Sequence, residues 1–409
     1  MRVLTINCGS SSLKFDVLDA EPGTDRVERI ARGSVDTLRG EATSTIEVGE
    51  TRLRHVGPAG DEAAAFQRAV DLLEEAGLGR DFRGVGHRVV HGGVHLREPM
   101  LIDQPVMEAI AVASELAPLH NQPALRAIRA AQAHFGGDVP MVATFDTGFY
   151  ASLPDAASRY ALPRALSSRL GIRRFGFHGL AHRHMVETFR GLRPEVAGPR
   201  LISLQLGNGC SATASRDGVA VDTSMGFTPL EGLIMGTRSG DLDPAIALYV
   251  AGHDGLRPGE VETLLNTQSG LLGISELSSD MRELSDAAAS GHAQAAEAIE
   301  AFCYRAIKYV GAYLAVLGGA DAVIFGGGIG EHSPEIRERI CAGLAWAGLH
   351  IDPARNDQPS TEPMRITSDS ASIEAWVVPV DEAVVIARDV VDCLGAIEEA
   401  DQESDGAAT

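Results

Sequence analysis

The hydrophobic positions of the first twenty residues form two short runs that favour β-strands, around Val3–Ile6 and Phe15–Leu18. The stretch 7–12 between them, NCGSSS, is rich in glycine and hydroxyl residues, so the pattern predicts an N-terminal β-hairpin. The same turn is a candidate phosphate cradle, because small residues let backbone N–H groups approach an anion while serine hydroxyls donate beside them. The candidate residues at this turn are Ser10, Ser12 and Lys14, with the Asn7 carbonyl oxygen suited to hydrated Mg²⁺.

A second hairpin of similar build is predicted about half the chain length later. Residues 201–206 have the composition of a strand, 207–211 (GNGCS) of a turn, and 212–214 of a returning strand. Two such hairpins predict two related halves that face one another across a nucleotide. Chance similarity of two short turns is the alternative.

The rest of the first half predicts a mixture of strands and helices. Alternating positions in 27–56 indicate further strands, and 61–77 has the apolar face of a helix that ends at Gly77. A buried strand is expected within 82–93, where Arg88 lies near paired glycines. This arginine is either a functional cation or an ordinary residue at a solvent edge.

Two further polar positions of the first half follow or precede predicted elements. Asn121 is expected to cap a helix with Pro123 in its first turn, which places His120 at the helix N-terminus, where an anion is favoured. A structural cap is the alternative for His120. The strand 139–145 is followed by Asp146, at the position where α/β proteins often carry catalytic residues and often carry only turns.

The second half contains three glycine-rich stretches. Residues 173–179 combine arginines, aromatics and His178, and the loop 226–243 is long, apolar and carries Arg238. The third stretch follows a predicted helix over 297–318. It consists of a strand over 322–325, glycines at 326–330 and a helix over 334–345. This order is typical of nucleotide-binding loops, because a backbone without side chains lets a base or phosphate lie close to it. A generic tight turn remains the alternative. A closing helix is expected over 382–394.

Composition restricts the class of protein. A chain of 409 residues is long enough for two domains, and its net charge of −21 argues against nucleic acid and anionic membranes as partners. The acidic segment 398–409 is expected to be a disordered tail. Five widely spaced cysteines without a CxxC pair indicate free thiols, and the absence of a signal-peptide pattern or a membrane span favours a cytoplasmic protein.

Nine stretches together resemble the acetate kinases, in the expected order from residue 1 to about 394. They are NCGSSSLK (7–14), GHRVVHGG (86–93), LAPLHN (116–121), FDTGF (145–149), GFHG (176–179), LGNGCS (206–211), DTSMGFTPLEGLIMGTRSGDLDPA (222–245), GGIGE (327–331) and DEAVVIARD (381–389). The resemblance implies an α/β fold of the actin, sugar kinase and heat-shock ATPase type, with two ribonuclease-H-like domains and a nucleotide cleft between them. The acceptor domain would be 1–150 plus 383–397 and the nucleotide domain 151–382.

The resemblance also implies the reaction. A homodimer would transfer the γ-phosphoryl group of ATP reversibly to acetate, giving acetyl phosphate and ADP, with Mg²⁺ or in its place Mn²⁺. Arg88 would hold acetate, His178 and Arg238 the transferring group, and Asn7 and Glu382 the metal. The family's acid at Asp146 is often given as a proton donor or acceptor. Acetate is already ionised at pH 7, so we expect Asp146 instead to orient Arg88 or a metal-bound water.

The resemblance assigns the remaining site residues to two groups. The acceptor's methyl pocket and its rim would be Val90, Leu119, His120, Phe177 and Pro229. The nucleotide residues would be Ser10, Ser12, Lys14, Gln205, Leu206, Gly207, Asn208, Gly209, Asp280, Met281, Arg282, Gly327, Gly328, Ile329, Gly330 and Glu331.

Four positions depart from the family pattern. Gln205 replaces a usual histidine, Tyr150 another histidine, Ala181 a serine and His332 an asparagine. These changes bear on turnover rate and donor preference rather than on reaction class. The rival interpretations are a propionate or butyrate kinase of the same fold and a non-catalytic nucleotide-binding protein of the actin type.

Overall fold

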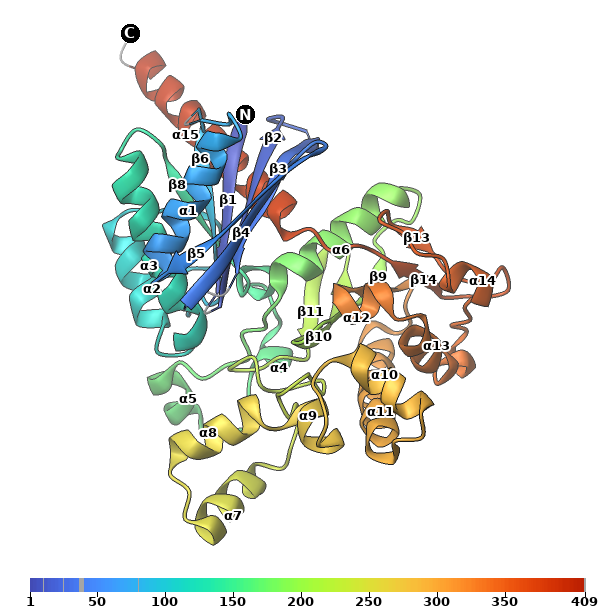
Figure 1. Ribbon diagram of the computed structural model, residues 1–409. Coiled ribbons are helices and arrows are strands. Elements are labelled where there is room, and N and C mark those ends of the chain that lie inside the picture. The colour runs from blue at the N-terminus through green and yellow to red at the C-terminus, as the bar shows by residue number, and fades with distance from the viewer. Residues whose placement is uncertain (10, 25, 37–39, 80, 408–409) are drawn as a thin grey trace. The chain divides into compact units, whose positions relative to one another are not determined.

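The chain, seen in a computed structural model, forms two compact units (Figure 1). The structure describes residues 1–9, 11–24, 26–36, 40–79 and 81–407, without the side chains of 118–119 and 398–407. Unit 1 comprises Met1–Ala151 and Asp381–Thr409, and unit 2 comprises Ser152–Val380. Asp381 and Glu382 therefore belong to the first unit, whereas the sequence analysis assigned them to the second.

Unit 1 contains an eight-stranded sheet in the order β5-β4-β3-β2-β1-β6-β8-β7. Its strands are β1 Arg2–Cys8, β2 Ser12–Ala20, β3 Val27–Asp36, β4 Gly40–Val48, β5 Thr51–Ala59, β6 Gly84–Val89, β7 Met100–Leu101 and β8 Met141–Phe145. Its helices are α1 Glu62–Glu75, α2 Gln104–Ala113, α3 Pro118–Phe135 and α15 Glu382–Ala407, with the 3₁₀ turn η1 Gly148–Tyr150. The antiparallel pair β1–β2 is the predicted N-terminal hairpin, and β6 runs parallel to β1.

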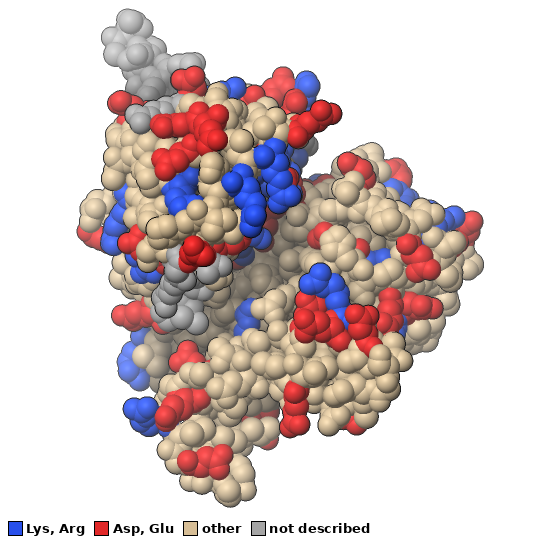
Figure 2. All heavy atoms as spheres, in the orientation of Figure 1, with Lys and Arg blue, Asp and Glu red and all other residues tan. Residues whose placement is uncertain are grey.

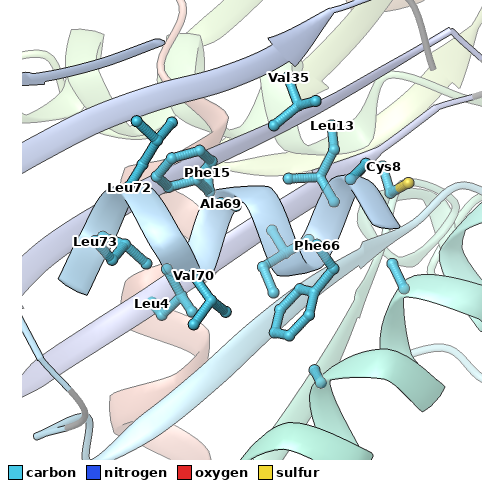
Figure 3. Close-up of a cluster of buried hydrophobic side chains, with 14 of the residues drawn as sticks. Leu4, Cys8, Leu13, Phe15, Val35, Phe66, Ala69, Val70, Leu72 and Leu73 are labelled. Carbon is cyan, nitrogen blue, oxygen red and sulfur yellow. The ribbon is translucent and has the colours of Figure 1, made fainter. Parts of the chain in front are cut away.

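The core of unit 1 follows from the helical period of 61–77. Asp61 caps α1 by accepting a hydrogen bond from the Ala64 amide. The apolar face of α1, including Phe66 and Val70, packs against sheet residues such as Leu4 and Phe15 (Figure 3). This packing fixes the strands whose ends carry the polar residues described below.

Helix α15 packs against residues of β1, β2 and β8 through a second buried cluster that includes Val390 and Leu394. A Cβ atom at Gly86 of β6 would lie only 2.3 Å from Ile386 Cγ2, so glycine is required for this close approach. Helix α15 continues to Ala407, which includes most of the segment expected to be a disordered tail. Glutamate, glutamine and alanine in this segment are good helix formers, which accounts for the continuation.

Unit 2 contains a six-stranded sheet in the order β11-β10-β9-β12-β14-β13. Its strands are β9 Arg200–Leu206, β10 Cys210–Arg216, β11 Val219–Thr223, β12 Ala322–Gly326, β13 Met364–Arg365 and β14 Glu374–Val377. Its helices are α4 Asp155–Ser158, α5 Arg164–Leu170, α6 Gly179–Leu192, α7 Pro244–Asp254, α8 Pro258–Thr267, α9 Gly270–Ser275, α10 Met281–Ala289, α11 Ala293–Leu317, α12 Gly327–His332, α13 Pro334–Ala342 and α14 Pro353–Asn356, with the 3₁₀ turn η2 Ala345–Ala347.

The two sheets repeat one strand order. In unit 1, the order β3-β2-β1-β6-β8 has antiparallel neighbours up to β1 and parallel neighbours after it. In unit 2, β11-β10-β9-β12-β14 has the same pattern. The hairpin β9–β10 therefore has the same place in its sheet as β1–β2, which supports the prediction of two related halves.

The secondary structure differs from the sequence analysis at two glycine-rich positions. The turn of the second hairpin is limited to 207–209, because Cys210 and Ser211 already pair in β10. The predicted glycine loop at 326–331 is mostly the short helix α12.

Charged side chains of both signs lie beside one another on the face drawn in Figure 2. Within unit 1, Arg29 forms ion pairs with both Asp16 and Asp381. No helix within the described residues has the length and apolar content needed to cross a membrane.

Candidate active site

A cluster of four polar residues lies where the parallel strands of the unit 1 sheet end. Arg88 Nε and Nη2 donate to Asp146 Oδ1 at 2.9 Å and Oδ2 at 2.7 Å, and Arg88 Nη1 lies 3.0 Å from Glu382 Oε2. The Asn7 amide nitrogen lies 3.4 Å from the same Glu382 oxygen. Asn7 and Arg88 are near the ends of neighbouring parallel strands, and Asp146 follows the next strand, β8. The parallel order brings together side chains that are far apart in the sequence.

Burial strengthens the interactions between the charges of this cluster. The exposed fraction is 15% for the Arg88 side chain and 1% for that of Asp146. Burial opposes the charged form of Arg88, but the charges of Asp146 and Glu382 prevail and raise the Arg88 pKa. Burial also raises the pKa of Glu382, while Arg88 opposes that shift. Lys14, on β2 opposite Asn7, adds a further positive charge that acts on Glu382.

The segment that follows β6 is held by two side chains that the sequence analysis did not assign to this role. The Asn121 amide accepts from the His91 backbone N–H at 3.0 Å and donates to the His91 carbonyl at 2.8 Å. Thr147 Oγ1 accepts from the Gly92 N–H at 3.0 Å. Asn121 is therefore not the predicted helix cap: α3 begins at Pro118, and the fully buried amide satisfies backbone groups beside Arg88.

The predicted acceptor-pocket residues are divided between the two units. Val90, half-buried, follows β6, and His120 lies in the first turn of α3 rather than before it. Phe177 is buried in unit 2, where the Pro229 carbonyl accepts a hydrogen bond from Arg238. The side chain of Leu119 and all of Ser10 lie outside the described residues. The grouping of these residues into one pocket stays a prediction.

In unit 2, Arg238 and His178 converge on the turn of the second hairpin. A Cβ atom added to Gly209 would lie 2.6 Å from Arg238 Nη2 and 3.3 Å from His178 Nε2. Arg238 Nη1 donates to the Pro229 carbonyl at 2.6 Å, and no carboxylate among the described residues pairs with this guanidinium. Burial lowers the pKa of Arg238, yet an arginine remains charged at neutral pH. A half-buried cation without a carboxylate partner is suited to a bound anion.

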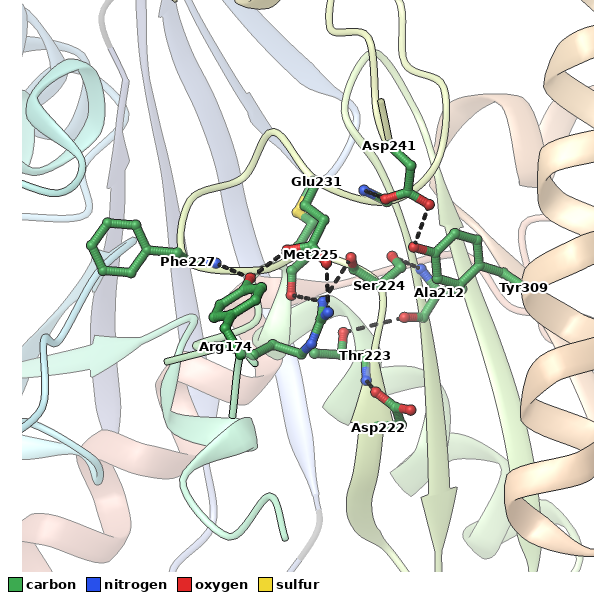
Figure 4. A network of polar contacts seen from close by, with 12 residues as sticks. Arg174, Ala212, Asp222, Thr223, Ser224, Met225, Phe227, Glu231, Asp241 and Tyr309 are labelled. Atoms are coloured by element: carbon green, nitrogen blue, oxygen red, sulfur yellow. Dashed lines mark hydrogen bonds and ion pairs between the residues drawn. The ribbon is translucent and has the colours of Figure 1, made fainter. Parts of the chain in front are cut away.

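The loop that carries Arg238 is anchored at both ends (Figure 4). Near its start, Glu231 accepts hydrogen bonds from Arg174 and Tyr160. Near its end, Asp241 Oδ1 accepts from the Gly232 N–H at 2.8 Å, and its Oδ2 accepts from the Tyr309 hydroxyl at 2.8 Å. Side-chain hydrogen bonds therefore hold this loop near both of its ends.

The sequence analysis did not predict the hydrogen-bond network around Arg174, which supports the loop that carries Arg238. Arg174 also donates to the carbonyls of Ser224 and Met225, which come directly before the same loop. The sequence analysis noted the pair of arginines at 173–174 but assigned Arg174 no role. Its partners are 50 to 57 residues away, so spacing alone gave no signal for the network.

The predicted nucleotide segments lie around the second hairpin. The Gly236 N–H donates to the Asn208 carbonyl at 2.9 Å, and a Cβ at Gly236 would overlap the Asn208 side chain. Gly327 has φ +74°, and a Cβ there would lie 2.7 Å from the Leu206 carbonyl and 2.9 Å from Gln205 Nε2. Glycine is therefore required where α12 meets the end of β9.

Three of the predicted nucleotide residues have side chains with other structural roles. Glu331 Oε1 accepts from the Gly327 N–H at 2.8 Å and the Val380 N–H at 3.1 Å, so this carboxylate holds the backbone of the glycine segment. Asp280 caps α10 and pairs with exposed Arg282. Met281 is buried in the core, so it offers a ligand little side-chain surface.

The pair Asn7 and Glu382 fits a divalent cation of the Mg²⁺ type. Such a cation is usually held by one or two carboxylates together with substrate phosphates and waters. Within the described residues, no group of three or more His, Cys, Asp or Glu could hold a metal ion alone. Asn7 and Glu382 would therefore hold such a cation only together with other oxygens, such as those of substrate phosphates.

Two α/β units of one strand order, with cationic side chains gathered at glycine turns, define a phosphotransferase with the fold of the actin-type ATPases. The chain belongs to the acetokinase family, whose family model matches residues 2–388. It is therefore a kinase that transfers phosphate to a carboxylate, with ATP as co-substrate and a divalent metal.

Several relatives match nearly the whole chain. An acetate kinase from Solibacter usitatus is 49% identical over 407 residues, covering 96% of this chain and 98% of the relative. The crystal structure of Porphyromonas gingivalis acetate kinase has a TM-score of 0.88 at 34% identity, covering 96% of this chain and 99% of that one. A propionate kinase from Francisella tularensis has a TM-score of 0.89 at 36% identity with the same coverage.

Proposed function

We propose that this chain is an acetate kinase that transfers the γ-phosphoryl group of ATP reversibly to acetate, in line and with Mg²⁺. The observation that carries the proposal is the pair of cationic sites: Arg88 at the end of β6 and Arg238 with His178 at the second hairpin. The reaction joins two anions, so it needs a cation for each. Unit 1 and unit 2 each supply one.

The acceptor needs no general base. Acetate is ionised at neutral pH, so the barrier is repulsion between its carboxylate and the γ-phosphate. Charge neutralisation by Arg88 and Arg238 and positioning by His178 address that barrier directly. The bidentate contact from Asp146 to Arg88 supports an orienting role for this aspartate. The guanidinium is then presented in one orientation for the acceptor.

In the proposed mechanism the metal neutralises charge on the phosphates when it is bound. Asn7 and Glu382 would hold it, and Lys14 would meet the phosphates beside them. Arg238 and His178 would donate to the equatorial oxygens of the transferring group, which is where charge is spread in the transition state. The backbone around Asn208, Gly209 and the α12 glycines would receive the nucleotide.

We further propose that the protein is a homodimer. Helix α7 has the apolar sequence PAIALYVAGHD, but none of its residues is buried in the described chain. Leu248 is 77% exposed and Tyr249 is 70% exposed. An apolar helix left open in this way is suited to association with a second copy.

Hydroxamate trapping of the acyl phosphate, with ATP and Mg²⁺, tests the proposed reaction. Acetate should give the highest kcat/KM, and Arg238→Ala should lower kcat by about 10³-fold or more. The likeness to a propionate kinase favours one alternative, so propionate and butyrate are compared in the same assay. A higher kcat/KM with propionate than with acetate would mean that propionate is the preferred substrate. Absence of product with all three acids would favour a non-catalytic nucleotide-binding protein.

A further inference from the structure

A chain of buried hydrogen bonds leads from the sheet of unit 2 to His178. Ser211 Oγ lies 2.9 Å from His178 Nδ1 and 2.7 Å from His182 Nε2. His182 Nδ1 lies 2.7 Å from Ser203 Oγ. Ser203 is on β9, Ser211 on β10 and His182 on α6, so three elements contribute to one line of contacts that ends at His178.

The inner part of this chain is sealed from solvent. Ser203, His182 and Ser211 are all fully buried. Burial lowers the pKa of His182 to about 3, so its imidazole is neutral at physiological pH and carries one N–H. A neutral imidazole has one donor and one acceptor nitrogen, and each faces a serine hydroxyl.

Counting protons restricts the chain to two directions. In the first direction, Ser203 donates to His182 Nδ1, His182 Nε2 donates to Ser211, and Ser211 donates to His178 Nδ1. A neutral His178 then carries its proton on Nε2. In the opposite direction, a neutral His178 would carry its proton on Nδ1 and present a bare Nε2.

Between the two neutral forms of His178, the position of its Nε2 favours the first direction. This atom, and not Nδ1, lies beside Gly209, where the Arg238 guanidinium also converges. A bare nitrogen lone pair there would face phosphate oxygens, which are acceptors as well, so only the Nε2–H form can donate to them.

The backbone of His178 shows that its orientation is imposed by the surroundings. Its φ is +57° and its ψ is +29°, in the left-handed region that non-glycine residues rarely adopt. Such a conformation persists where surrounding contacts determine it, and such positions cluster at active sites. The bond from Ser211 to Nδ1 is one such contact.

We propose that Ser211 and His182 are positioning residues for phosphoryl transfer, which hold the His178 ring and keep its proton on Nε2. The proposal rests on the role of His178 given under the proposed function. The hairpin β9–β10 would then have two roles. Its backbone would bind phosphate, and its Ser211 would control the tautomer of His178.

Substitutions at Ser211 test the proposal by steady-state kinetics. Ser211→Ala should lower kcat by about 10- to 100-fold, the range for one charge-assisted hydrogen bond lost in the transition state, with KM for ATP and acetate changed by less than about threefold. Ser211→Thr keeps the hydroxyl and should restore most of kcat. The matched control is Ser215→Ala: Ser215 is a fully buried serine on the same face of β10, and its hydroxyl has no partner within the described chain. It should leave kcat unchanged.

A double-mutant cycle separates this proposal from the proposed role of His178. Ser211→Ala should have no further effect on kcat once His178→Asn is present, because the ring that it positions is gone. An equal loss of kcat in both backgrounds would overturn the proposal. A His178→Asn variant with unchanged kcat would instead overturn the role of His178 itself.

The tautomer can be read directly in the wild-type protein, so the test does not depend on a variant that folds. In ¹⁵N-histidine NMR spectra, His178 should carry its proton on Nε2 near pH 8, and His182→Leu should shift it toward a mixture of tautomers. His182→Gln, whose amide can still donate to Ser211, should restore the wild-type signal. A wild-type His178 protonated on Nδ1 alone would refute the inference.

Discussion

Replacing Asp146 by asparagine distinguishes an orienting aspartate from a general base. Asparagine is the same size, but it keeps one carbonyl oxygen and presents an NH₂ group to an Arg88 N–H. Of the contacts at 2.9 and 2.7 Å, one therefore becomes donor against donor. The buried position leaves no water to replace the lost acceptor, since Asp146 is nearly inaccessible.

The expected loss of stability can be estimated from these contacts. One charge-assisted hydrogen bond is worth about 1.5–3 kcal/mol. Leaving a buried charge without any partner costs about 3–5 kcal/mol, but Glu382 remains 3.0 Å from Arg88 as a counterion. We expect the free energy of unfolding to fall by about 2–3 kcal/mol. For a unit of this size that lowers Tm by about 4–12 °C.

The kinetic signature follows from the orienting role. Asp146→Asn should raise KM for acetate by about tenfold or more, because the Arg88 guanidinium is no longer held in one orientation. The pH profile of kcat/KM should keep its shape, since acetate loses no proton. Initial rates are measured by hydroxamate trapping across pH 5–9 at saturating ATP and Mg²⁺.

The matched control is Glu62→Gln, at a second bidentate pair of unit 1. Glu62 accepts from Arg126 at 2.7 Å through both oxygens, so the chemical change is the same. It should lower Tm while leaving KM for acetate unchanged. If Asp146→Asn lowered kcat alone and removed the acidic limb of the pH profile, Asp146 would be a general base and the orienting role would be wrong.

Four further predictions concern separate parts of the chain. Gln205→His places an ionisable imidazole close to Gly327 of α12 and should raise kcat; an unchanged or lower kcat would mean that other groups already compensate. Val90→Ala should raise the kcat/KM of propionate relative to acetate by about tenfold, the worth of one methylene, and an unchanged ratio would remove Val90 from the acceptor pocket. Glu331→Ala removes the acceptor of two backbone N–H groups and should raise KM for ATP about tenfold without affecting KM for acetate; equal effects on both would indicate general unfolding. Leu248→Glu should shift the sedimentation coefficient from dimer to monomer, and a dimer that persists would exclude α7 from the interface.

Local patterns in the sequence predicted which helices and strands form better than they predicted which residues meet in space. The two hairpins and the helix α1 each depend on residues close together in the chain, and the structure confirms them. The meeting of Arg88 and Asp146 was expected only as a hypothesis. Fifty-eight residues separate the two, and the parallel pairing of β6 with β8 that joins them leaves no local pattern.

Buried polar residues whose hydrogen-bond partners are distant in the sequence were the hardest to interpret. Asn121 before a proline has the same local pattern whether it caps a helix or satisfies a distant strand end, and the structure shows the second. Ser211 was expected in the turn of the second hairpin, but it pairs in β10 and its side chain is buried between two histidines. In both cases the partner is a long-range backbone or ring nitrogen, which the sequence pattern cannot specify.

The two guanidiniums of the proposed mechanism differ in their charge environment, and the difference matches the anions that they would meet. Arg88 already has two carboxylate partners, so the charge of its guanidinium is balanced before any acceptor binds. Binding acetate there would add another negative charge, which a metal cation together with Lys14 could offset. Arg238 has no carboxylate partner among the described residues, so its full charge is available to a phosphoryl group. An acceptor site that depends on the metal should lose affinity for acetate when Mg²⁺ is removed, whereas binding of inorganic phosphate at Arg238 should not.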